Sequence, residues 1–75
     1  MWYAIIYNGE PKEIDMPDGI FILQPGMLLG YTEYPDDETW QDYPEFQFVK
    51  TENIEKEPLK WEYKNGQWLE IDKIS

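Results

Sequence analysis

Turn-forming residues interrupt this chain at short intervals, and their spacing restricts the fold more than any other feature of the sequence. Glycine or proline occurs in each interruption, at positions 8–9, 11, 17–19, 25–26, 30, 35, 44, 58 and 65–66. The segments between these positions are rich in aromatic and β-branched residues, a pattern typical of short strands joined by turns. The sequence therefore predicts a β-rich fold.

We expect one mainly β domain over residues 1–75, with five to seven short strands in an antiparallel sheet or barrel. Most linkers are short, which favours antiparallel pairing of neighbouring strands. The first predicted strand has no charged residue, so we expect it to be central and covered on both faces. The predicted strands are 2–7, 12–14, 20–23, 27–34, 45–50, 59–63 and 67–71.

The C-terminal segment predicts a hairpin that turns at positions 65–66, where the sequence is Asn-Gly. One register has a two-residue turn and pairs Tyr63 with Trp68. The other has a three-residue loop and pairs Trp61 with Leu69. We prefer the second register because it gathers the apolar side chains of the hairpin on one face and directs Trp68 to solvent.

One segment, 36–43, predicts a short helix packed on or beside the sheet. Pro35 suits the first helical position, and the acids at 36–38 follow where the helix dipole favours negative charge. Trp40 and Tyr43 are three residues apart and would share one face of the helix.

The charge of the chain is strongly unbalanced. Sixteen acids face six lysines and no arginine, for a formal net charge of −10. Residues 1–49 hold ten of the acids and one lysine, so this part carries −9. Nucleic acids and anionic membranes are bound through Lys and Arg, so we expect the chain to bind neither directly. A basic protein partner is favoured, because opposite charges steer association.

Most catalytic residue types are missing from this chain. It has no Cys, His or Arg, and its serine is at position 75. A Ser/His/Asp or Cys/His arrangement and a disulfide therefore cannot be built. We do not expect phosphoryl transfer, because the chain has no arginine and no glycine-rich phosphate loop. A carboxylate pair such as Asp37 and Asp42 could act as acid and base, but a domain this small rarely holds a suitable cleft. We predict no enzymatic activity and no cofactor.

Metal binding would have to use oxygen ligands, for which the acids at 36–38 and 42 are the candidates. They lack the spacing of a calcium-binding loop, so we expect no metal site. The N-terminus shows no signal pattern, and the longest apolar run, 20–23, is too short to cross a bilayer. We expect a soluble, cytoplasmic protein.

The acidic and aromatic segment 31–48 is the most distinctive part of the sequence. It contains six acids and no lysine. In one interpretation its aromatic side chains are core residues and its acids provide solubility. In the other it is a recognition surface, where carboxylates bind the basic groups of a partner and aromatic rings supply contact area. The candidate partner-binding residues are Glu33, Tyr34, Asp36, Asp37, Glu38, Trp40, Asp42, Tyr43 and Glu45.

Two alternatives remain open at this point. Trp40, Trp61 or Trp68 could be stacking platforms for a sugar, although single tryptophans more often lie in a core. Homodimerisation is also open, because small sheets with aromatic edges often complete their cores by pairing.

The small size, the missing Cys, His and Arg, the acidic run 33–45 and the segment 61–68 resemble small phage-encoded accessory proteins. Some proteins of that class are anti-restriction or anti-CRISPR inhibitors, and some imitate nucleic acid. The resemblance implies an inhibitor that occupies the basic, nucleic-acid-binding surface of a host or defence protein in the host cytoplasm. A phage structural or assembly component without enzymatic activity is the alternative that fits the same composition.

Overall fold

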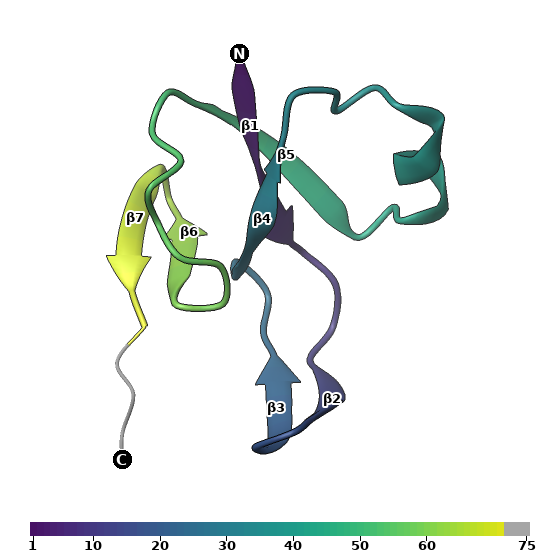
Figure 1. Cartoon of the computed structure of the whole chain (residues 1–75), viewed down its shortest axis with the longest axis vertical. Helices are drawn as coiled ribbons and strands as arrows, with labels where there is room; N and C mark the ends of the chain where they lie inside the picture. The colour runs from purple at the N-terminus through teal and green to yellow at the C-terminus, as the bar shows by residue number, and fades with distance from the viewer. Residues whose placement is uncertain (72–75) are drawn as a thin grey trace.

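The computed structural model describes residues 1–71, and within them the prediction of a mainly β chain with one short helix is confirmed (Figure 1). Seven short strands form three small antiparallel sheets, with strand orders β4-β1-β5, β2-β3 and β6-β7. The elements are β1 (Trp2–Tyr7), β2 (Lys12–Met16), β3 (Gly19–Leu23), β4 (Leu28–Thr32), the 3-10 helix η1 (Glu38–Asp42), β5 (Phe46–Thr51), β6 (Trp61–Lys64) and β7 (Gln67–Glu70). Within residues 1–71, no helix is long and apolar enough to cross a bilayer.

Strand β1 is the centre of the main sheet and pairs antiparallel with β4 on one side and β5 on the other. Its residues from Ala4 to Tyr7 are all buried. Alternate side chains of a strand point to opposite faces, and Ala4 and Ile6 lie in one buried cluster whereas Tyr7 lies in another. The expectation that this strand is central and covered on both faces is confirmed.

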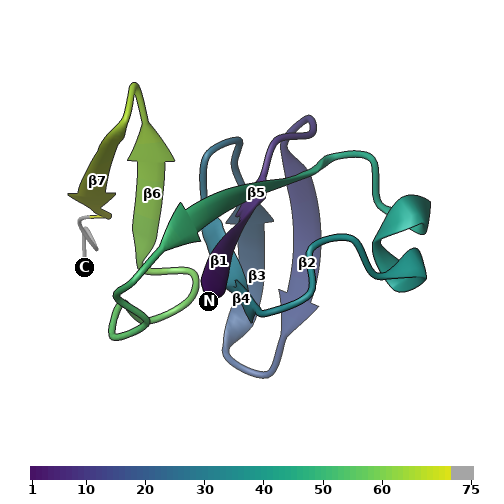
Figure 2. The ribbon, with the colours of Figure 1, turned by 90° about the horizontal axis from the view of Figure 1, so that it is seen from above.

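The β6–β7 hairpin lies beside the main sheet, and the β2–β3 hairpin extends beyond the end at which β1 ends and β4 begins (Figure 1 and Figure 2). The first cluster joins Ala4, Ile6 and Leu28 to half-buried aromatic side chains, mainly from β6 and β7. The second joins Tyr7, Leu23 and Met27 to half-buried side chains that include residues of β2 and β3. Large aromatic side chains bury roughly 150–250 Å² each, and they extend a core with few fully buried residues.

The register that we prefer for the C-terminal hairpin is wrong. The structure has the two-residue turn, which pairs Tyr63 with Trp68. Asn65 and Gly66 have φ angles of 53° and 75°, and two positive φ angles are typical of a type I′ turn, whose twist matches that of the strands. Trp68 packs against the first cluster, whereas Leu69 is 43 % exposed. In the observed register the larger apolar side chain, Trp68, packs into the core, and Leu69 stays at the surface.

β6 begins later and β4 ends earlier than predicted, both for local reasons. β6 begins at Trp61 rather than at 59, because Leu59 has a left-handed backbone with φ of 68°. β4 ends at Thr32 rather than at 34, where the hydroxyl of Thr32 accepts a hydrogen bond of 3.1 Å from the Tyr34 amide and the chain turns.

The predicted helix is present as the 3-10 helix η1 and begins later than the proline suggests. Asp37 is its N-cap, with an extended backbone, and its side chain accepts a hydrogen bond of 2.9 Å from the Thr39 amide. Pro35 therefore lies before the cap and not at the first helical position. The capping aspartate, rather than the proline, determines where this helix starts.

Candidate protein-binding surface

The connection between β4 and β5 forms a projection beside the main sheet, and we call its residues 33–45 the acidic lobe (Figure 1). All nine candidate partner-binding residues lie on it. It contains η1 and six carboxylates. Its position at the side of the molecule leaves these groups accessible to a partner.

Hydrogen bonds within the acidic lobe hold its shape. The indole Nε1 of Trp40 donates to the carbonyl oxygen of Tyr34 over 3.0 Å, and the Trp40 amide donates to the Asp37 carbonyl oxygen over 3.0 Å. The hydrogen bonds from Thr39 hold the pKa of the Asp37 carboxyl below its ordinary value, because they stabilise the ionised form. Asp37 is therefore both a cap of the helix and a negative charge at neutral pH.

Four aromatic rings attach the acidic lobe to strand β5. The Trp40 ring lies edge-on to Phe48 with centroids 5.6 Å apart, and Tyr43 stacks on Phe46 at 5.0 Å with an interplanar angle of 8°. Trp40 is half-buried, whereas 42 % of Tyr43 remains exposed. The cluster therefore packs the lobe against β5 and also presents one ring to solvent.

Two hollows lie on either side of the adjacent carboxylates Asp36 and Asp37. The first, of about 340 Å³, is lined by the aromatic cluster, and the second, of about 590 Å³, extends toward Met1 and Tyr3. Pro35, Asp36 and Asp37 line both hollows. A basic side chain entering either hollow would therefore meet carboxylates beside an apolar wall.

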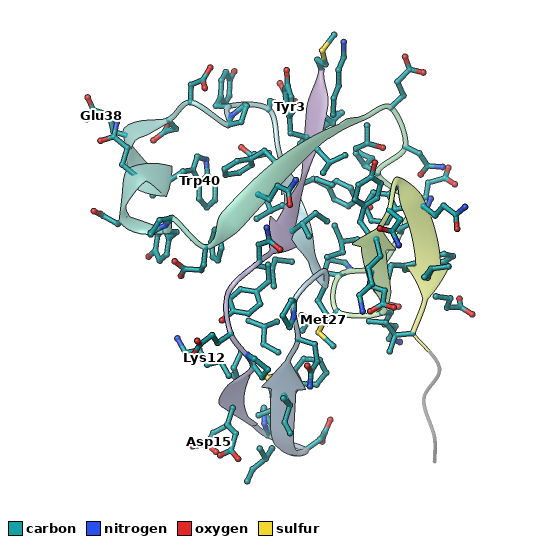
Figure 3. The ribbon with its side chains drawn as sticks, turned by 180° about the vertical axis from the view of Figure 1, so that it is seen from behind. Tyr3, Lys12, Asp15, Met27, Glu38 and Trp40 are labelled. Atoms are coloured by element: carbon teal, nitrogen blue, oxygen red, sulfur yellow. The ribbon has the colours of Figure 1, made fainter. Side chains whose placement is uncertain are left out.

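The structure does not bring every candidate residue to these hollows. Glu33 and Tyr34 line the second hollow, and 70 % of Tyr34 is exposed. Glu38, Asp42 and Glu45 line neither hollow. Figure 3 shows Glu38 at the outer end of the lobe, whereas Trp40 is turned toward β5.

In the part of the chain that the structure describes, no carboxylate of the acidic lobe forms an ion pair with a lysine. Within residues 1–71, the ion pairs join Lys60 to Glu57 at 3.1 Å and Lys64 to Glu62 at 3.6 Å, both near the β6–β7 hairpin. The negative charges of the lobe are therefore not offset by local ion pairs, and they add to a negative potential over this face.

A second group of acids lies on the β2–β3 hairpin, away from the acidic lobe. Figure 3 shows Asp15 near the tip of this hairpin and Glu38 at the outer end of the lobe, with Lys12 between them. The sequence leaves open whether the two groups form one patch. The structure places the tip of the hairpin apart from the outer end of the lobe, whereas the connection before β2 meets the base of the lobe, where the Asn8 amide donates to the carbonyl oxygen of Glu45 over 2.7 Å.

The remaining site predictions concern metals and sugars. Among residues 1–71, no group of three or more His, Cys, Asp or Glu side chains is arranged to hold a metal ion. Trp61 and Trp68, two of the candidate sugar platforms, instead face the ammonium group of Lys56 at 5.2 and 5.3 Å from their ring centroids.

Several residues at these surfaces are not indicated by the sequence pattern. Met1 and Tyr3 line the second hollow although they precede the lobe by some thirty positions in the sequence. Lys56 lies in the connection between β5 and β6, which has no regular secondary structure, and this connection brings its side chain to the two tryptophans. No protein-family model matches the chain, and no curated protein or solved structure matches it significantly.

Proposed function

We propose that this chain is a non-catalytic binding protein whose acidic lobe docks on a basic, nucleic-acid-binding surface of another protein and inhibits it by occupying that surface. One observation carries the proposal. Six carboxylates project on a single connection, and none of them pairs with a lysine among residues 1–71. Carboxylates accept charge-assisted hydrogen bonds from Arg and Lys, as phosphates do.

The packing of the acidic lobe also supports the proposal. The Trp40 hydrogen bond and the aromatic cluster hold the lobe in one shape before a partner arrives. A preorganised surface loses less conformational entropy on binding. Exposed Tyr34 and Tyr43 would supply rigid contact area beside the carboxylates.

The resemblance to small phage-encoded inhibitors favours a host defence or nucleic-acid-processing protein as the partner. In this proposal the chain acts in the host cytoplasm. Its charge steers it toward a cationic groove and keeps it away from nucleic acid itself.

The test compares two variants that remove the same amount of charge from different places. The lobe variant is D36N/D37N/E38Q/D42N, and the hairpin variant is E10Q/E13Q/D15N/D18N. Amide substitutions retain the size of each side chain, and Asn at position 37 preserves the N-cap. Each protein is immobilised, host lysate is passed over it at low and at high ionic strength, and captured proteins are identified by mass.

We expect the unsubstituted chain and the hairpin variant to capture the same basic protein at low salt, and the lobe variant to lose it. Capture should weaken steeply as salt rises, because exposed charges are screened. Equal capture by both variants, or capture that does not respond to salt, would contradict the proposal.

A structural or assembly role is the second candidate, and the β2–β3 hairpin favours it. Ile20 and Ile22 are 67 % and 46 % exposed, and a hollow of about 370 Å³ lies between this hairpin and Leu59. An assembly contact through this apolar surface would persist at high salt and would be lost in an I20K/I22K variant. The lobe variant would retain it.

A further inference from the structure

The connection between β5 and β6 brings one lysine onto two tryptophan rings of the C-terminal hairpin. The Nζ atom of Lys56 lies 5.2 Å from the ring centroid of Trp61 and 5.3 Å from that of Trp68. The Trp68 ring is itself held edge-on against Tyr63, with centroids 4.9 Å apart. We call Trp61 and Trp68 the tryptophan pair.

The tryptophan pair lies against this charge and attracts it. A cation within about 6 Å of a ring centroid is attracted to the negative face of the ring, and tryptophan attracts it most strongly. Within residues 1–71, no carboxylate lies within ion-pairing distance of the Lys56 ammonium group. Two rings at nearly equal distances therefore replace the acidic partner that Lys60 and Lys64 both have.

Lys56 is held in two separate ways. Its backbone carbonyl oxygen accepts a hydrogen bond of 3.0 Å from the hydroxyl group of Tyr31. Its ammonium group lies against the two rings. The side chain can therefore leave the tryptophan pair while Tyr31 keeps the backbone in place. Lys56, Trp61 and Trp68 are all half-buried, so part of this site is exposed to solvent although both tryptophans also pack against the first cluster.

We infer that the tryptophan pair is a recognition site for the guanidinium group of a partner's arginine, and that Lys56 is the internal cation that occupies it in the free protein. A guanidinium group is planar and weakly hydrated, and it stacks on aromatic faces better than an ammonium group does. The exchange replaces one cation with another over the same rings, and the displaced ammonium group becomes hydrated. The site lies outside the acidic lobe and does not rest on the proposed function.

The test measures binding of N-acetyl-arginine amide to the full chain by NMR, through the indole N–H signals of the tryptophans. Three proteins are compared: the unsubstituted chain, K56Q and K56R. K56Q removes the internal cation, so it should bind the probe several-fold more tightly than the unsubstituted chain. K56R places a better-stacking cation on the rings, so it should bind the probe more weakly.

At this site the shifts should appear in the indole signals of Trp61 and Trp68, with that of Trp2 as the internal control, and the Trp40 signal reports binding of the probe to the acidic lobe. The neutral probe N-acetyl-glutamine amide should cause no shift. Equal affinity in the three proteins, or an equal response to the neutral probe, would overturn the inference. If K56Q does not fold, the comparison of K56R with the unsubstituted chain decides alone, because that pair keeps the positive charge.

The lobe variant D36N/D37N/E38Q/D42N separates this inference from the proposed function. It should lose capture of the basic partner and still bind the arginine probe with the affinity of the unsubstituted chain. Loss of probe binding in the lobe variant would show that the probe responds to the acidic lobe and would overturn the tryptophan site. Failure of partner capture alone would leave the tryptophan site intact.

Discussion

At the scale of single residues, Gly9 lies where the end of β1, the next connection and the base of the acidic lobe meet. A Cβ atom at this position would lie 2.7 Å from the hydroxyl oxygen of Tyr7 and 3.0 Å from Cβ of Glu45. The Tyr7 side chain is only 6 % exposed, so it has little room to move. The Asn8 amide also donates to the carbonyl oxygen of Glu45 over 2.7 Å. Close packing, and not an unusual φ angle, explains the glycine.

We predict that Gly9→Ala destabilises the fold by about 1–3 kcal/mol, the usual cost of inserting a methyl group into a packed site. Chemical denaturation of the variant measures this change. Gly30→Ala is the matched control, because a Cβ atom there would meet nothing within 4 Å and its φ is not positive. That variant should differ from the unsubstituted chain by no more than about 0.5 kcal/mol. Similar effects of the two substitutions would contradict the packing at Gly9.

A second prediction concerns the pH dependence of the acidic lobe. The pKa of Asp37 is lowered by the hydrogen bonds from Thr39. Its stabilising effect is therefore complete above the ordinary aspartate pKa of about 3.9 and is lost as pH falls through the lowered value. The Thr39 amide signal, followed by NMR, should titrate with a midpoint below the ordinary value. In D37N this titration should disappear, and a midpoint at or above the ordinary value would show that the cap does not favour the charged form.

At the scale of elements, the sequence of the β6–β7 hairpin is compatible with two registers, and packing against the core determines which of them forms. The Asn-Gly turn allows both positive φ angles, and the resulting register places Trp68 opposite Tyr63. Trp68 then joins the cluster built on Ala4, Ile6 and Leu28. A shift by one residue would turn Trp68 to solvent and direct Leu69 to the core.

This register leads to a prediction about neighbouring residues. Trp68→Ala should reduce the free energy of unfolding by about 2–3 kcal/mol, somewhat below the 3–5 kcal/mol typical of buried aromatic residues, because Trp68 is half-buried. Leu69 is 43 % exposed, so Leu69→Ala should cost no more than about 0.5 kcal/mol. Urea denaturation of both variants measures the difference. A larger loss for Leu69→Ala would indicate the three-residue loop instead.

At the scale of the whole molecule, a small core that half-buried aromatic side chains extend has to hold together a chain with a net charge of −10. The molecule measures 35 × 25 × 23 Å, so its carboxylates lie close enough to repel one another at low ionic strength. This repulsion opposes folding, and the same charge would assist association with a cationic partner.

Salt should therefore act in opposite directions on folding and on partner binding. We predict that Tm rises with sodium chloride concentration, by about 4–8 °C for each roughly 1 kcal/mol of repulsion that is screened. Capture of the basic partner should weaken over the same range. The lobe variant carries four fewer negative charges, so its Tm should be higher at low salt and should rise less. A Tm that falls or stays constant with salt would show that self-repulsion is negligible.

The parts of this protein that sequence predicts well are those determined by local backbone preferences. The bounds of β1 agree with the prediction from its uncharged run, and the short helix forms beside Asp37. The acidic lobe is also a continuous segment, so its candidate residues share one connection whatever the order of the strands. Whether they bind a partner stays a prediction.

Tertiary structure decided what depends on contacts between distant segments. The sequence alone does not place Met1 and Tyr3 beside Asp36, place Asp15 apart from Glu38, or bring Lys56 to Trp61 and Trp68. It also predicts the wrong hairpin register, because both registers satisfy the turn. Turn residues determine only their own φ and ψ angles. Which face of a strand is buried, and which residues pair across two strands, depend on the apolar surface that the rest of the chain buries.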